Sequence, residues 1–238
     1  MSRYLEFLFG TNKPAMDGHL LRSRPPASLR SVVFIFVLGN LVPAGLMAAT
    51  TSMGEGSMGL TAIMVLQPLF LLLLIFIADR GTTLPLEPLD TGKVALFAIL
   101  WPVLLRVVTV VVAALQTPLG LVAEETNNPL MMDLDMAGIE RLIMMVAVGL
   151  LIPIAEEFFY RDLLYRSLGW LGPGWAATIS SLIWALMHGS LPLVLPLFMV
   201  GMLLAGLYEI TENLGAPILA HIGFNLSSLI MVFLMPIF

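Results

Sequence analysis

The chain has 238 residues, of which 59% are hydrophobic and 11% are charged, and its formal net charge is −5. A soluble domain carries about a quarter charged residues, so this composition, with a mean hydropathy of +0.98, indicates a membrane protein. The sequence contains no cysteine, which excludes disulfides, thiolate nucleophiles and cysteine-ligated metals. Nothing in the composition indicates a nucleic-acid partner.

The first 30 residues are polar and basic, and they contain several prolines. They lack an apolar core followed by a small-residue cleavage site, so we do not expect them to form a secretory signal peptide. We predict that residues 1–30 are a cytoplasmic N-terminal tail and that residues 31–238 form one membrane domain. Contact with membrane lipid follows from that assignment.

Apolar segments follow the tail at lengths near the ~20 residues that a helix needs to cross the hydrocarbon. The fold class is therefore predicted as all-α, a polytopic membrane helix bundle with about seven (seven or eight) transmembrane helices. The predicted spans are 31–50, 58–78, 94–115, 139–168, 174–188, 191–208 and 216–236. The loop 117–140 is acidic, whereas the tail and the loop 79–93 carry basic residues, so the positive-inside rule predicts a cytoplasmic N-terminus.

The fourth span contains three ionisable side chains, Glu156, Glu157 and Arg161. A charge at the bilayer centre costs roughly 2.5–3.5 kcal/mol on insertion scales, so these residues need partners, water or a function. At about thirty residues the segment would be ~45 Å long as a continuous helix, which exceeds the hydrocarbon thickness. Pro153 removes a backbone donor one turn before the glutamates, which predicts a kink where the polar groups gather.

A turn rich in glycine follows, and two polar residues are equally distant from it. Glu156 and His188 each lie 16 residues from Gly172. If the flanking helices pack antiparallel, a carboxylate and an imidazole meet at one depth, about 24 Å from the turn. The stretch 189–196 contains two prolines and cannot be an unbroken helix, which favours a water-filled pocket beside His188.

The last span places His221 and Asn225 four residues apart and thus on one helix face. An imidazole and an amide aligned in this way can stabilise a developing oxyanion. Together with the carboxylate and the first imidazole, they form a constellation suited to hydrolysis of a carbonyl compound.

These residues resemble the motifs of the CPBP family of intramembrane proteases, also called the Abi family, which includes the Ras-converting CAAX endopeptidases and bacteriocin-immunity relatives. The family pattern Glu-Glu-x-x-x-Arg is matched by Glu156, Glu157 and Arg161, and His-x-x-x-Asn is matched by His221 and Asn225. Phe-x-x-x-His occurs here with a tryptophan, as Trp184 to His188, which keeps a large aromatic wall.

The resemblance implies a protease-like domain whose catalytic part is 139–238. It implies hydrolysis of a peptide bond in a membrane-associated or CAAX-like prenylated protein or peptide substrate. Glu156 and His188 would activate a water, and His221 with Asn225 would stabilise the tetrahedral intermediate. Glu157 and Arg161, at i and i+4, are predicted to form a supporting ion pair.

Metal dependence stays open at this point. Two histidines and a glutamate could bind zinc or another divalent metal, but the sequence has no His-Glu-x-x-His helix and asparagine is a poor zinc ligand. No cofactor is therefore certain from the sequence. A divalent metal such as zinc stays open, and we favour a metal-free site.

Other interpretations also remain. Isolated polar residues in membrane helices often act as interhelical contacts, and Arg106 in the third span could either pair for stability or bind an acidic group of the substrate. Intramembrane charges also mark proton-coupled transporters, although no inverted repeat of broken helices is present. A third alternative is a non-catalytic binding or immunity protein that keeps the fold.

Overall fold

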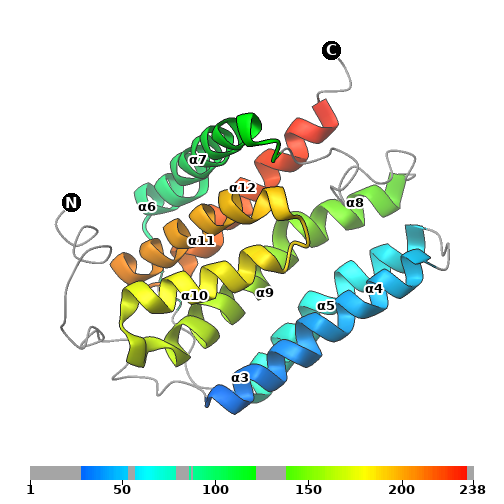
Figure 1. The fold of residues 1–238 in the computed structure, drawn as a ribbon, viewed down its shortest axis with the longest axis horizontal. Coiled ribbons are helices and arrows are strands. Elements are labelled where there is room, and N and C mark those ends of the chain that lie inside the picture. Colours follow the sequence, from blue (N-terminus) through cyan, green and yellow to red (C-terminus); the bar gives the residue numbers. More distant parts are fainter. Residues whose placement is uncertain (1–27, 53–56, 79–85, 87, 122–137, 235–238) are drawn as a thin grey trace.

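The computed structural model describes residues 28–52, 57–78, 86, 88–121 and 138–234. These residues form a bundle of helices that run side by side, without a strand among them (Figure 1). The predicted all-α class is confirmed. Most of the predicted tail 1–30 and most of the acidic loop lie outside the described residues.

Five of the described helical stretches are long and apolar enough to cross a membrane, so the chain is an integral membrane protein. These stretches are Leu29–Ala49, Thr61–Ala78, Thr91–Leu119, Arg141–Tyr165 and Leu191–Thr211. The predicted span 174–188 corresponds to a helix of 14 residues, and the apolar stretch of the last helix is also shorter. The total of seven crossings therefore stays a prediction.

The helical elements follow one another along the chain in two halves. In the N-terminal half they are α3 (Leu29–Phe36), η1 (Val37–Leu41), α4 (Val42–Ser52), α5 (Ser57–Ala78), α6 (Thr91–Ala95), η2 (Leu96–Leu100), α7 (Trp101–Gln116) and η3 (Thr117–Leu119). In the C-terminal half they are α8 (Gly138–Val146), η5 (Ala147–Leu151), α9 (Ile152–Glu157), η6 (Phe158–Tyr165), η7 (Gly169–Leu171), α10 (Pro173–Leu186), α11 (Leu191–Thr211) and α12 (Gly215–Leu234).

Three π-helical segments, η1, η2 and η5, each end two residues before a proline, namely Pro43, Pro102 and Pro153. Proline has no N–H, and its ring collides with the carbonyl four residues earlier in an α-helix. A wider turn in front of the proline removes that collision and keeps the helix continuous. At Pro153 the helical run is continuous and contains such a widened turn, and the predicted kink itself stays a prediction.

The irregular backbone predicted for 189–196 is confined to its beginning. Helix α10 ends at Leu186 and α11 already begins at Leu191. Pro192 lies in the first turn of α11, where no helical acceptor requires an N–H, so it does not interrupt the helix. Gly189 makes the reversal possible with a φ of +70°, which side chains with a Cβ rarely adopt.

The core of the bundle lies between η6, α10 and α11, with α12 packed beside them. Its largest fully buried side chains include several aromatic residues, Phe159, Tyr160, Tyr165, Trp184 and Tyr208. Helix α5 packs along α8, η5, α9 and η6, and Phe36 stacks on Phe159 with ring centroids 5.9 Å apart. The N-terminal helices therefore support the long helix that carries the glutamates.

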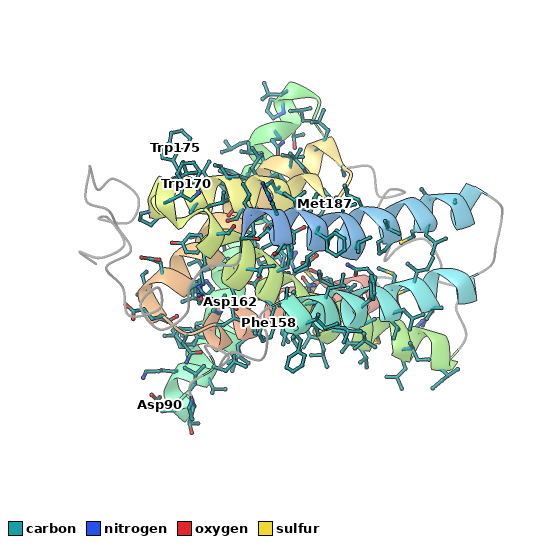
Figure 2. All side chains as sticks on the ribbon, turned by 90° about the horizontal axis from the view of Figure 1, so that it is seen from below. Asp90, Phe158, Asp162, Trp170, Trp175 and Met187 are labelled. Carbon is teal, nitrogen blue, oxygen red and sulfur yellow. The ribbon has the colours of Figure 1, made fainter. Side chains whose placement is uncertain are left out.

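Connections alternate between the two ends of the bundle. Helices α3, α6 and α10 begin in the left half of Figure 1, whereas α4 ends and α8 begins on its right side. Trp170 and Trp175, both exposed, lie together at the end where α10 begins (Figure 2). Exposed tryptophans of this kind suit the membrane–water interface. This arrangement is compatible with the predicted sidedness, which itself stays a prediction.

Candidate active site

Three helices that are distant in the sequence bring most of the predicted site residues together. The long helix α8–η6 carries the acidic pair and Arg161, and α12 carries His221 and Asn225, while His188 follows the end of α10. Helix α12 packs against both α9 and η5, and α10 packs against η6.

One carboxylate oxygen of Glu156 lies close to both Trp184 and His221. The indole N–H of Trp184 donates to Glu156 Oε2 at 2.8 Å, and His221 Nε2 lies 3.8 Å from the same atom. The side chain of Glu156 is 20% exposed, whereas that of His221 is 2% exposed. Glu156 is therefore held at one oxygen while part of its side chain stays accessible, as a group that acts on a water must be.

The tautomer of His221 follows from its partner on the other side. His221 Nδ1 lies 2.8 Å from Glu157 Oε1. An ionised carboxylate only accepts hydrogen bonds, so Nδ1 carries the proton and donates. In the neutral imidazole, Nε2 then has the free lone pair and faces Glu156. The two adjacent glutamates thus have different positions: one orients the imidazole, and the other meets its reactive nitrogen.

Glu157 also forms the ion pair that its spacing from Arg161 predicts. Arg161 Nε lies 3.2 Å from Glu157 Oε2, at an angle outside that of a hydrogen bond, and the two side chains are 1% and 0% exposed. Arg161 further donates to the Gly201 carbonyl at 3.4 Å and lies 5.2 Å above the Trp184 ring. Two charges buried this deeply require each other, because either one alone would be uncompensated.

His188 joins the site through Trp184. Its Nδ1 donates to the Trp184 carbonyl at 2.9 Å, and the two rings meet edge to face with centroids 4.9 Å apart. The hydrogen-bond partner of Glu156 on α10 is thus Trp184, one turn before His188. The eight-residue π-helix η6 explains this offset, because its wider turns advance less per residue than the α-helix assumed in equal counting.

Asn225 binds a backbone carbonyl that the widened turn leaves without a helical donor. In η5 the Ile152 N–H bonds to the Ala147 carbonyl, five residues back. The Val148 carbonyl would then need the N–H of residue 153, which is a proline. The Asn225 Nδ2 donates to it instead, at 2.9 Å. One of the two amide hydrogens of Asn225 is therefore engaged in holding α12 against the long helix.

The opposite side of α12 is held by a second proline turn. A Cβ built at Gly223 would meet the Ala98 carbonyl at 2.6 Å and would also collide with the Pro102 ring. Ala98 lies four residues before Pro102, so its carbonyl also lacks the usual α-helical donor. Only glycine allows α12 to approach this closely, and the approach fixes the helix that carries His221 and Asn225.

Arg106 reinforces the same contact from α7. Its Nη2 donates to the Phe224 carbonyl at 2.9 Å and to Ser227 Oγ at 3.0 Å, and it also contacts Ser228 Oγ. The guanidinium lies 4.3 Å from the Phe224 ring centroid. These contacts favour the stabilising interpretation of Arg106 over the binding of an acidic substrate group.

Within the described part of the chain, no three His, Asp or Glu side chains are grouped as ligands of one metal ion. The donors nearest to each other are Glu156 Oε2 and His221 Nε2. A histidine whose Nδ1 is fixed by a carboxylate is also the form that binds metals, so this chemistry alone does not exclude an ion.

Two contributions of the structure were missed by the sequence analysis. Trp184 was interpreted as an aromatic wall, although its indole N–H contacts Glu156. The Val148 carbonyl was not considered, although the spacing of Pro153 after it was a visible signal that this acceptor loses its helical donor.

Comparison with protein-family models gives a match to part of the chain. Residues 138–227 match the family described as type II CAAX prenyl endopeptidase Rce1-like. Neither the comparison with curated proteins nor that with solved structures gave a match. The matched segment spans all three motifs, so the resemblance drawn from them is confirmed for this part of the chain.

Proposed function

We propose that this chain, whose C-terminal half carries the Rce1-like type II CAAX prenyl endopeptidase match, hydrolyses a peptide bond of a membrane-associated protein or peptide through water activated by Glu156. The observation that carries the proposal is the contact of Glu156 with His221, whose other nitrogen is fixed by Glu157. An accessible carboxylate beside an oriented imidazole is the arrangement that general base catalysis needs.

In the proposed reaction Glu156 removes a proton from a water while the water oxygen bonds to the substrate carbonyl carbon. The tetrahedral intermediate carries its negative charge on the former carbonyl oxygen. When the C–N bond breaks, the amine leaves with the proton that Glu156 holds, and a carboxylic acid is released. No group is consumed, and Glu156 returns to its ionised form.

The remaining residues assist these steps. His188 accompanies Glu156 in activating the water, since its Nδ1 is held by the Trp184 carbonyl and its Nε2 is the nitrogen left for a substrate or water. His221 stabilises the oxyanion in its protonated form, in which Nε2 carries a proton that is taken from solvent before the substrate binds and is kept throughout the reaction. Asn225 contributes through the amide hydrogen that the Val148 carbonyl does not occupy. Glu157 and Arg161 support the site without touching the substrate.

The substrate class follows from the family description and stays part of the proposal. Type II CAAX prenyl endopeptidases are named for prenylated substrates, so we propose a peptide with a lipid-modified cysteine near its C-terminus. We further propose that 31–238 is one protease domain with its catalytic part in 139–238, and that the N-terminus is cytoplasmic.

The test uses the purified full chain in proteoliposomes with a pair of peptides of identical sequence, one farnesylated and one unmodified. We expect the wild-type protein to cleave the farnesylated peptide, with mass spectrometry locating the new terminus. Glu156→Gln should abolish cleavage. Asp90→Asn serves as the matched control, because Asp90 is an exposed helix cap and asparagine caps equally well.

Cleavage of both peptides would refute the prenyl requirement and keep the endopeptidase. Absence of cleavage of any membrane protein, together with an ion flux that Glu156→Gln removes, would instead favour transport. To detect cleavage of membrane proteins, mass spectrometry would map protein termini in two membrane samples. One sample contains the wild-type protein, and the other contains the Glu156→Gln variant.

A further inference from the structure

Trp184 lies at the centre of the polar cluster. It is 1% exposed, and its indole N–H donates to Glu156 Oε2 at 2.8 Å. Its ring meets His188 and His221 edge to face, with centroids 4.9 and 5.3 Å away, and Arg161 lies 5.2 Å above it. One buried side chain therefore contacts the carboxylate, both imidazoles and the supporting cation.

We propose that Trp184 is a positioning residue that fixes the Glu156 carboxylate through its indole N–H. This inference rests on the proposed function, because it assigns Trp184 a task in the reaction that Glu156 performs. Phenylalanine at this position would supply an aromatic ring but no donor.

The geometry explains why Glu156 needs such a donor. A glutamate side chain has several rotatable bonds, and Glu156 is the accessible member of the acidic pair. With Oε2 held by the indole N–H, Oε1 is the oxygen left to meet a water. A fixed orientation of this kind matters because a displacement of about 1 Å can lower a rate roughly a hundredfold.

The edge contacts add a second constraint. The positive edge of one aromatic ring prefers the negative face of another, so the edge-to-face contacts restrict both imidazole rings. The backbone carbonyl of Trp184 fixes the tautomer of His188, and the indole side chain of Trp184 holds the carboxylate of Glu156. Trp184 thus couples the two groups that the sequence predicted to meet directly.

The first measurement is spectroscopic and needs no substrate. The sequence has four tryptophans, so a sample labelled with ¹⁵N-tryptophan gives four indole N–H signals, and Trp184→Phe identifies that of Trp184. A hydrogen bond to a carboxylate moves an indole proton downfield. We expect the Trp184 signal, and none of the other three, to move upfield in Glu156→Gln. An unchanged Trp184 signal would overturn the proposal.

The second measurement is kinetic. Trp184→Phe should lower kcat about 10- to 100-fold and leave KM within about threefold, since the base is misplaced while the substrate still binds. Replacement of Trp184 by 3-benzothienylalanine, which keeps the bicyclic ring but has sulfur in place of the N–H, should lower kcat similarly without loss of packing. Full activity of that variant would overturn the positioning role.

Trp101→Phe is the matched control, because the buried Trp101 indole N–H has no partner among the described residues. We expect it to leave kcat unchanged. If the wild-type protein cleaves nothing, the proposed function fails, and the spectroscopic result alone still decides whether Trp184 holds Glu156.

Discussion

The Asn225 side-chain amide donates to the Val148 backbone carbonyl at 2.9 Å and thereby joins α12 to the long helix of the acidic pair. This carbonyl needs a donor from outside the helix. In a π-helical turn its donor would be the N–H of residue 153, and residue 153 is a proline, which has no N–H. The contact gives Asn225 a structural task in addition to the proposed stabilisation of an oxyanion.

Asn225→Ala is therefore expected to lower stability as well as activity. Loss of the Asn225 donor to the Val148 carbonyl should cost about 1–2 kcal/mol, measured by unfolding in detergent. Pro153→Ala restores an N–H at position 153, so Asn225→Ala should cost less in that background. Additive effects in this double-mutant cycle would contradict the linkage between the two residues.

Gly223→Ala should separate α12 from η2. The added Cβ would meet the Ala98 carbonyl at 2.6 Å, which is closer than real Cβ contacts allow, so the helix must shift. We expect a loss of about 1–3 kcal/mol together with a lower kcat, because His221 moves with the helix. Gly45→Ala, where nothing lies within 4 Å of the new Cβ, is the control and should not be destabilising. Equal effects of the two substitutions would refute the role of this close approach.

Glu157→Gln should destabilise the bundle more strongly than the loss of a surface charge would. It leaves Arg161 buried without its ion-pair partner, for which about 3–5 kcal/mol is typical. Glu157→Gln combined with Arg161→Met should recover a large part of the stability, because no charge is then unpaired. The double variant should still have a low kcat, because Nδ1 of His221 has lost its carboxylate partner. Thermal unfolding and turnover measured on the same samples separate the two effects.

Chelation provides a test of the favoured metal-free mechanism. Treatment of the purified protein with a strong chelator should leave cleavage within about twofold of the untreated rate, since Glu156 itself takes the proton in the proposed reaction. Metal content is measured before and after treatment. Stoichiometric zinc that survives purification, with loss of activity on its removal and recovery on its return, would make the site a metal site.

The sequence by itself determined the class of the protein and predicted the residues of the candidate site except for the contact of Trp184 with Glu156. In lipid, the backbone N–H and C=O groups of an apolar segment of membrane-spanning length are satisfied within the segment only by a helix. The all-α class therefore follows from composition and segment length. The i,i+4 spacing determined the pairing of Glu157 with Arg161, because residues so spaced are neighbours on any helix.

Only the tertiary structure decided how these residues meet. The widened turns of η6 shorten the axial advance between Glu156 and the turn at Gly172, so Glu156 faces Trp184 instead of the residue that equal counting selects. Such turns depend on which neighbouring helix supplies donors to the freed carbonyls, and that is a property of packing between distant segments. For the same reason, the second task of Asn225 could not be deduced from its spacing to His221.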